Sequence, residues 1–130
     1  MSGKKYLLDT NIIIGLFAGD QNILLNIEKS KEIFVPSIVL GELFYGAELS
    51  AKKTENLARL EKFAKACNVL SIDLGTAKSY GTIKSKLKTK GQPIPENDVW
   101  IAAIAHQHKL CLATRDAHFG FVEFVTVEKW

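Results

Sequence analysis

Four acidic residues have the types and spacing to do chemistry together: Asp9, Glu42, Asp98 and Asp116. Asp9 and Asp116 each follow a short apolar run that is typical of a buried strand. Glu42 lies on the apolar side of one expected helix, and Asp98 lies in the first turn of another. Because parallel sheets bind ligands beyond the carboxyl ends of their strands, we expect all four acids at that edge of a sheet.

Clustered carboxylates repel one another unless some keep a proton or a cation lies between them. Mg²⁺ prefers oxygen ligands and Mn²⁺ accepts the same set, whereas zinc is disfavoured because the expected ligands are not His and Cys. Ions held this way support cleavage of phosphodiester bonds. Each acid taken alone could instead be a turn residue or complement a helix dipole. The set as a whole predicts a Mg²⁺ site, with Mn²⁺ as a substitute.

The elements that would position these acids alternate between strands and helices along the chain. Strands are expected at 6–8, 33–35, 69–72, 110–114 and 124–127, with a loop at 115–120. Helices are expected between them, capped by Thr10, Ser37, Asp73 and Asn97. This alternation predicts an α/β fold with a mostly parallel sheet of about five strands and helices on both faces.

Length and composition favour one ordinary globular domain spanning residues 1–130. The chain is 47% hydrophobic and 24% charged, which excludes disordered and low-complexity classes. No apolar run is long enough to cross a membrane, and no signal-peptide core follows the N-terminus. We therefore expect a cytoplasmic protein. Cys67 and Cys111 are far apart in sequence and are expected to be small buried hydrophobic residues.

The four acids lie within longer motifs: Leu7-Leu8-Asp9-Thr10-Asn11, residues 36–47, residues 97–105 and residues 112–119. Taken together in this order, they resemble the PIN-domain ribonucleases, specifically VapC-type toxins of bacterial and archaeal toxin–antitoxin pairs. The resemblance implies a PIN-like three-layer αβα sandwich and a Mg²⁺- or Mn²⁺-dependent endoribonuclease. It also implies a homodimer and a tightly bound antitoxin protein.

In such a protein, Asp9, Glu42 and Asp98 would hold the metal, and Asp116 would be a fourth, more variable ligand. Glu42 could also help to deprotonate the attacking water. Asn11 and Thr114 match polar residues of the family, and we expect them to orient the carboxylates or bound water.

The net charge of +3 is distributed unevenly along the chain. Residues 52–90 hold ten Lys or Arg and three acids, a net +7, whereas the rest holds seven and eleven, a net −4. Four lysines at the end of one expected helix could contact an RNA backbone or simply be solvated: Lys84, Lys86, Lys88 and Lys90. Arg115 could touch a phosphate or be an ordinary loop arginine.

Other residues have less specific interpretations. Glu96 is expected to be solvated or an auxiliary acid, and His118 to serve a turn or to contact substrate. His106 and His108 are expected at a helix surface rather than in a metal site with Cys111. A last set of aromatic residues is expected in the core or a dimer interface, with base stacking as the alternative: Phe44, Tyr45 and Trp100.

Three other functions compete with the toxin. A housekeeping RNA-processing PIN nuclease would share the acids but lack a neighbouring antitoxin gene. A non-catalytic RNA-binding module would be expected to have lost some of them. A phosphoacceptor domain would need paired acids after the first strand, where only Asp9 is present.

Overall fold

The computed structural model describes residues 3–130 and has one five-stranded sheet, in the order β3-β2-β1-β4-β5. Every pair of neighbouring strands is parallel. The strands are β1 (Lys5–Leu8), β2 (Glu32–Pro36), β3 (Asn68–Leu70), β4 (Cys111–Thr114) and β5 (Val127–Lys129). The predicted α/β fold with a parallel five-stranded sheet is therefore confirmed.

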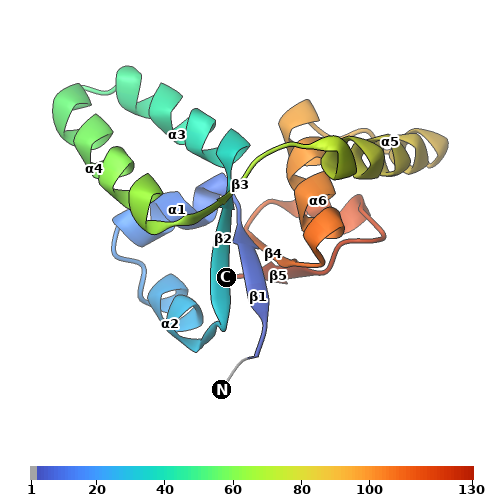
Figure 1. Ribbon diagram of the computed structural model, residues 1–130, viewed down its shortest axis with the longest axis horizontal. Coiled ribbons are helices and arrows are strands. Elements are labelled where there is room, and N and C mark those ends of the chain that lie inside the picture. The colour runs from blue at the N-terminus through green and yellow to red at the C-terminus, as the bar shows by residue number, and fades with distance from the viewer. Residues whose placement is uncertain (1–2) are drawn as a thin grey trace.

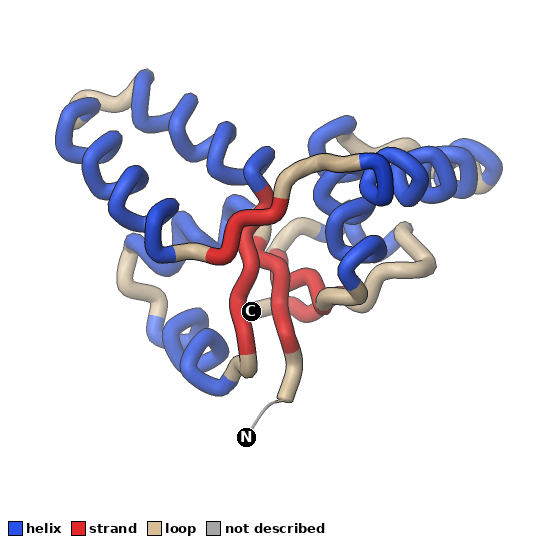
Figure 2. The backbone as a smooth tube through the Cα atoms, viewed as in Figure 1, coloured by secondary structure: helices blue, strands red, loops and turns tan. Residues whose placement is uncertain are grey.

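Helices lie on both sides of the sheet and complete a three-layer arrangement (Figures 1 and 2). In Figure 1, α1, α2 and the α3–α4 hairpin lie to the left of the central strands, and α5 and α6 lie to the right. No helix in the described part of the chain is long and apolar enough to cross a membrane. The helices are α1 (Thr10–Phe17), α2 (Gln21–Lys29), α3 (Ser37–Glu48), α4 (Lys53–Ala66), α5 (Leu74–Thr89) and α6 (Glu96–His108), with a short 3₁₀ helix, η1 (Ala117–Phe121).

The core is densest around the middle of the sheet and α6. All four residues of β4 are buried, and so are six residues of α6, three of which are alanines: Val99, Ile101, Ala102, Ala103, Ile104 and Ala105. This helix is apolar nearly all round because it packs against both β4 and α5. The small alanine side chains let α6 approach the sheet closely. That approach carries Asp98, in its first turn, towards the ends of the strands.

Three of the four expected helix caps are wrong. The residue at the cap position is Asp9 rather than Thr10 for α1, and a proline for α3 and α6. A proline has a fixed φ, so it can end an extended segment and begin a helix without a side-chain cap. The Asp73 cap is confirmed: its carboxylate accepts a hydrogen bond from the Thr76 N–H at 3.1 Å, and the Thr76 hydroxyl accepts one from the Asp73 N–H.

The strand boundaries differ from the expectation most for β3 and β5, and by one residue at one or both ends for the other strands, and η1 occupies part of the expected loop. β3 ends at Leu70 rather than 72, and β5 covers residues 127–129 rather than 124–127. The aromatic character of Phe124 suggested a strand, but its ring instead packs against Lys86 and His106. Pairing with β4 sets the true position of β5.

Candidate active site

The fold places the first and last of the predicted acids beside its topological switch point. Asp9 directly follows β1, and Asp116 lies two residues beyond β4. These two strands are neighbours, yet the chain reaches β4 only after building β2 and β3 on the other side of β1. Ligands of such sheets bind in the crevice where the strand order reverses.

Asp9 is buried, with 5% of its surface exposed, and its carboxylate is held by fixed donors. It accepts hydrogen bonds from the Thr114 hydroxyl at 2.7 Å, the Thr10 N–H at 2.8 Å and the Asn11 amide at 3.4 Å. Burial raises the pKa of Asp9, the bonds from Thr114 and Thr10 oppose the rise, and the charge of Asp116 adds to it. Asn11 and Thr114 thus both donate hydrogen bonds to the Asp9 carboxylate.

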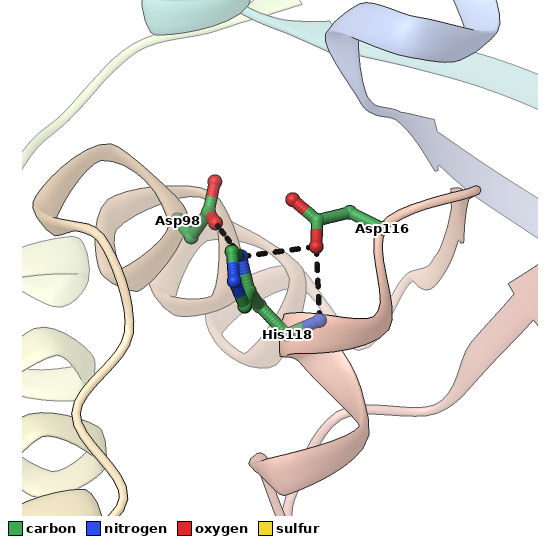
Figure 3. A group of neighbouring side chains, drawn as sticks. All are labelled: Asp98, Asp116 and His118. Carbon is green, nitrogen blue, oxygen red and sulfur yellow. Dashed lines mark hydrogen bonds and ion pairs between the residues drawn. The ribbon is translucent and has the colours of Figure 1, made fainter.

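Asp98 and Asp116 face each other across the imidazole of His118 (Figure 3). The His118 Nδ1 lies 3.0 Å from one Asp116 oxygen and 3.3 Å from one Asp98 oxygen. The Asp98 side chain is only 14% exposed. Burial, together with the nearby charges of Asp116 and Asp9, raises the pKa of Asp98 to about 6.

Glu42 joins the site from α3 through residues next to the other acids. One of its oxygens accepts a hydrogen bond from the Thr10 hydroxyl at 3.1 Å, and the other accepts one from the Asn97 amide at 3.3 Å. Thr10 follows Asp9 and Asn97 precedes Asp98, so the two side chains expected to cap helices instead position Glu42. Because Asp9 and Pro95 take the cap positions of α1 and α6, the side chains of Thr10 and Asn97 are available for Glu42.

The donor set fits a hard divalent cation. Single ligand atoms of Asp98, Asp116 and His118 lie within 4.8 Å of one another, and Asp9 is near enough for its charge to act on Asp98. Glu42 is linked to this group through Thr10 and Asn97, the neighbours of Asp9 and Asp98 in the sequence. Carboxylate oxygens are the ligands that Mg²⁺ and Mn²⁺ prefer. Buried acids that raise each other's pKa lose this repulsion when a cation binds between them.

Comparison with known proteins identifies the family. Residues 6–125 match the family model of the PIN domain. This chain belongs to the PIN-domain family. Among VapC relatives of this PIN domain, Ribonuclease VapC2 of Haemophilus influenzae is 34% identical over 129 residues, which cover 97% of this chain and 98% of that protein. A tRNA(fMet)-specific endonuclease VapC of Shigella flexneri is 32% identical over 130 residues, with the same coverage.

Solved structures of VapBC complexes share the architecture of this PIN domain. DNA-bound VapBC from Salmonella typhimurium matches with a TM-score of 0.89 at 32% identity, covering 98% of both chains. VapBC2 from Rickettsia felis, bound to a DNA fragment from its promoter, matches with a TM-score of 0.88 at 29% identity and covers 97% of this chain and 98% of that one. The PIN-like, VapC-type resemblance and the PIN-like fold are thereby confirmed.

The predicted RNA-contacting residues of this PIN domain lie outside the acid cluster and are mostly engaged. The Arg115 guanidinium donates to Asp20 at 2.8 Å and to the Trp130 carbonyl at 2.7 Å. Lys84 pairs with Glu96 at 2.9 Å, which ties that extra acid to α5 through Tyr80 and Lys84. The other three lysines differ: Lys86 lies over the Phe124 ring, Lys90 pairs with Glu123, and Lys88 is exposed.

His118 is the site residue that the sequence interpretation undervalued. The backbone N–H of His118 does serve a turn, because it donates to the Asp116 carboxylate at 2.9 Å. The His118 ring also bridges two acids, Asp98 and Asp116. The spacing Asp116-x-His118 was the available signal, since two residues of one tight turn can share a ligand. Sequence alone could not show that Asp98 closes the same group from α6.

The remaining candidates make contacts away from the acids. The His106 Nδ1 lies 2.9 Å from the Ser79 hydroxyl, and the buried Cys111 thiol faces Glu128 at 3.7 Å, whereas Cys67 is only half-buried. Trp100 stacks on Tyr80 with ring centroids 3.9 Å apart. In contrast to the half-buried Phe44, Tyr45 is 68% exposed and is not a core residue.

Proposed function

We propose that this PIN-domain protein is the endoribonuclease toxin of a type II toxin–antitoxin pair and that it depends on Mg²⁺, with Mn²⁺ as a substitute. The observation that carries this proposal is the pairing of Asp98 and Asp116 beside the buried Asp9. Three acids whose charges act on one another, two of them well shielded from water, favour a bound divalent cation. The names of the VapC relatives support RNA as the substrate.

The ion would be held by Asp9, Glu42, Asp98 and Asp116, directly or through water. When bound, it would supply Lewis-acid activation of water and offset the charge on the leaving oxygen. Thr114, Asn11 and the Thr10 N–H keep the Asp9 carboxylate in one orientation. Such fixed donors spare the site from reorganising during the reaction.

Glu42 would accept the proton of the attacking water. Hydrogen bonds from Thr10 and Asn97 to its two oxygens support this role by limiting the motion of the carboxylate. The water oxygen attacks phosphorus, and the bond from phosphorus to the 3′ oxygen breaks. The departing 3′ oxygen takes a proton from solvent. The products would be a 5′-phosphate and a 3′-hydroxyl, as the family resemblance suggests.

The decisive experiment expresses wild type and Asp98→Ala in cells and sequences RNA ends. We expect growth arrest and new 5′ ends from wild type only, and loss of cleavage by the purified enzyme in EDTA. Glu96→Gln is the matched control, because this acid lies two residues earlier but contacts Tyr80 and Lys84. Cleavage by a folded Asp98→Ala protein would contradict the proposal.

The partner of this toxin would be an antitoxin, since the solved relatives are VapBC complexes. We also propose a homodimer of single-domain chains that acts in the cytoplasm. Tyr45 and Leu49, 68% and 70% exposed at the end of α3, are candidates for apolar contacts between copies. A small neighbouring gene whose product co-purifies with the chain would support the toxin over a housekeeping nuclease, and light scattering would test the dimer.

A further inference from the structure

A hollow of about 280 Å³ opens beside the acid cluster, between the ends of β4 and β5 and the helix η1. It shares Thr114 and Asp116 with the candidate active site. The remaining lining comes from the segment that follows β4 and from the two ends of β5: Arg115, Ala117, Gly120, Val127 and Lys129. The hollow therefore borders the candidate active site.

Lys129 is the cation of this hollow that is available to a ligand. Arg115 already binds Asp20 and the Trp130 carbonyl, whereas Lys129 is exposed and is in no ion pair with the described residues. Thr114 and Lys129 are register partners on neighbouring parallel strands. Side chains at paired positions point to the same face of a sheet, so Lys129 lies on the face where Thr114 holds Asp9.

We propose that this hollow binds the RNA strand on one side of the cleaved bond and that Lys129 binds a backbone phosphate there. The inference rests on the proposed ribonuclease function. An RNA strand that approaches the acid cluster meets repulsion from several carboxylates at once. A nearby unpaired ammonium group offsets that repulsion for the adjoining phosphate, and release of counterions adds to affinity.

Two small residues leave the hollow open beside η1. Ala117 and Gly120 are small, and a Cβ built on Gly120 would meet no heavy atom within 4 Å. A side chain added at Gly120 would therefore extend into open space rather than into the fold. A Gly120→Glu substitution should fill the hollow and add a negative charge without distorting the backbone.

The test measures cleavage of a short single-stranded oligoribonucleotide that contains one cleavage site, with Mg²⁺ and at several salt concentrations. For Lys129→Gln we expect KM to rise several-fold with kcat nearly unchanged. The slope of log KM against log salt should fall by about 0.7, the share of one phosphate contact on a single strand. Gly120→Glu should raise KM further, with thermal unfolding close to that of wild type.

The matched control is Lys31→Gln, which removes the same charge at an exposed position. Lys31 lies just before β2, at the amino ends of the strands, whereas Lys129 lies at the carboxyl end of β5. Oligonucleotides with one phosphate neutralised by methylphosphonate then locate the contact. Wild type should lose affinity when the phosphate at one position near the cleaved bond is neutralised, and Lys129→Gln should be insensitive to that change.

If wild type leaves the RNA intact, both the proposed function and this inference are overturned. If wild type cleaves but Lys129→Gln keeps the same KM and salt slope, only this inference is overturned.

Discussion

The acid cluster and the lysine segment at residues 84–90 carry opposite charges, and the fold treats them in opposite ways. Asp9 and Asp98 are shielded from water, and the neighbours that hold Asp9 are neutral donors, such as Thr114 and Asn11. The lysines lie on the exposed face of a helix, and acids from other parts of the chain pair with two of the four, Lys84 and Lys90. Repulsion is thus retained in the first region and relieved in part in the second.

This difference shows why charge counted along the sequence misjudges charge in space. Residues 52–90 have a net charge of +7, but Glu48, Glu96 and Glu123 lie outside that segment and pair with lysines inside it. Exposed ion pairs of this kind are weak and can exchange partners. The shielded acids cannot exchange partners in this way. A bound cation should therefore lower the electrostatic energy of the acid cluster more than an anion lowers that of the lysine segment.

The largest effect should come from neutralising a shielded acid. Asp9→Asn keeps the shape of the side chain but removes a charge from the site, and we expect cleavage to fall below detection. Asp73→Asn is the matched control, because Asp73 also lies between a strand and a helix, yet caps α5 away from the acids. RNA cleavage assays should separate the two variants; equal losses would show that the capping position matters rather than the cluster.

A smaller effect should follow from loosening the donors around Asp9. Thr114→Val removes the 2.7 Å hydrogen bond while keeping the volume. Loss of a group that orients metal ligands typically costs about 10–100-fold in activity or metal affinity. We expect kcat to fall by that order, and Thr114→Ser to restore most of it. Unchanged kcat in the valine variant would show that the Asp9 carboxylate keeps its orientation without the hydrogen bond from Thr114.

Without metal, the acid cluster should cost stability, and this cost should depend on pH. The folded pKa of Asp98 is about 6 against an ordinary value of 3.8. Between these values the folded chain holds a proton that the unfolded chain has released, so stability falls as pH rises through this range. In EDTA at pH 7, Asp98→Asn should melt several degrees above wild type, and saturating Mg²⁺ should reverse the order. An unchanged order in Mg²⁺ would argue against metal binding at Asp98.

The smallest effect should distinguish lysines within the segment at residues 84–90. Lys90 already pairs with Glu123, whereas Lys88 is in no ion pair or ring contact with the described residues. If the segment contacts an RNA backbone, Lys88→Gln should weaken RNA binding a few-fold and Lys90→Gln less. Filter binding at low and high salt would measure both. Equal, negligible losses would assign the segment to solvation alone.

Much of the fold was predictable because it depends on local patterns. The apolar runs before Asp9 and Asp116 identified the central strands, and alternation with amphipathic segments indicated a parallel sheet. The exact ends of β3 and β5 were not predictable, because edge strands are set by pairing rather than by propensity. Phe124 shows this: its aromatic ring suggested a strand, but packing against α5 decided its place.

The sequence by itself determined the chemistry of the site, because the identity of four acids and their positions after strands and on helix faces follow from residue types and periodicity. Only the tertiary structure decided which side chains touch. Thr10 and Asn97 bind Glu42 instead of capping helices, His118 bridges Asp98 and Asp116, and Lys129 lies beside Thr114. These contacts join residues as many as 55 positions apart in the sequence, and such proximity is created by sheet order and helix packing, which no local pattern encodes.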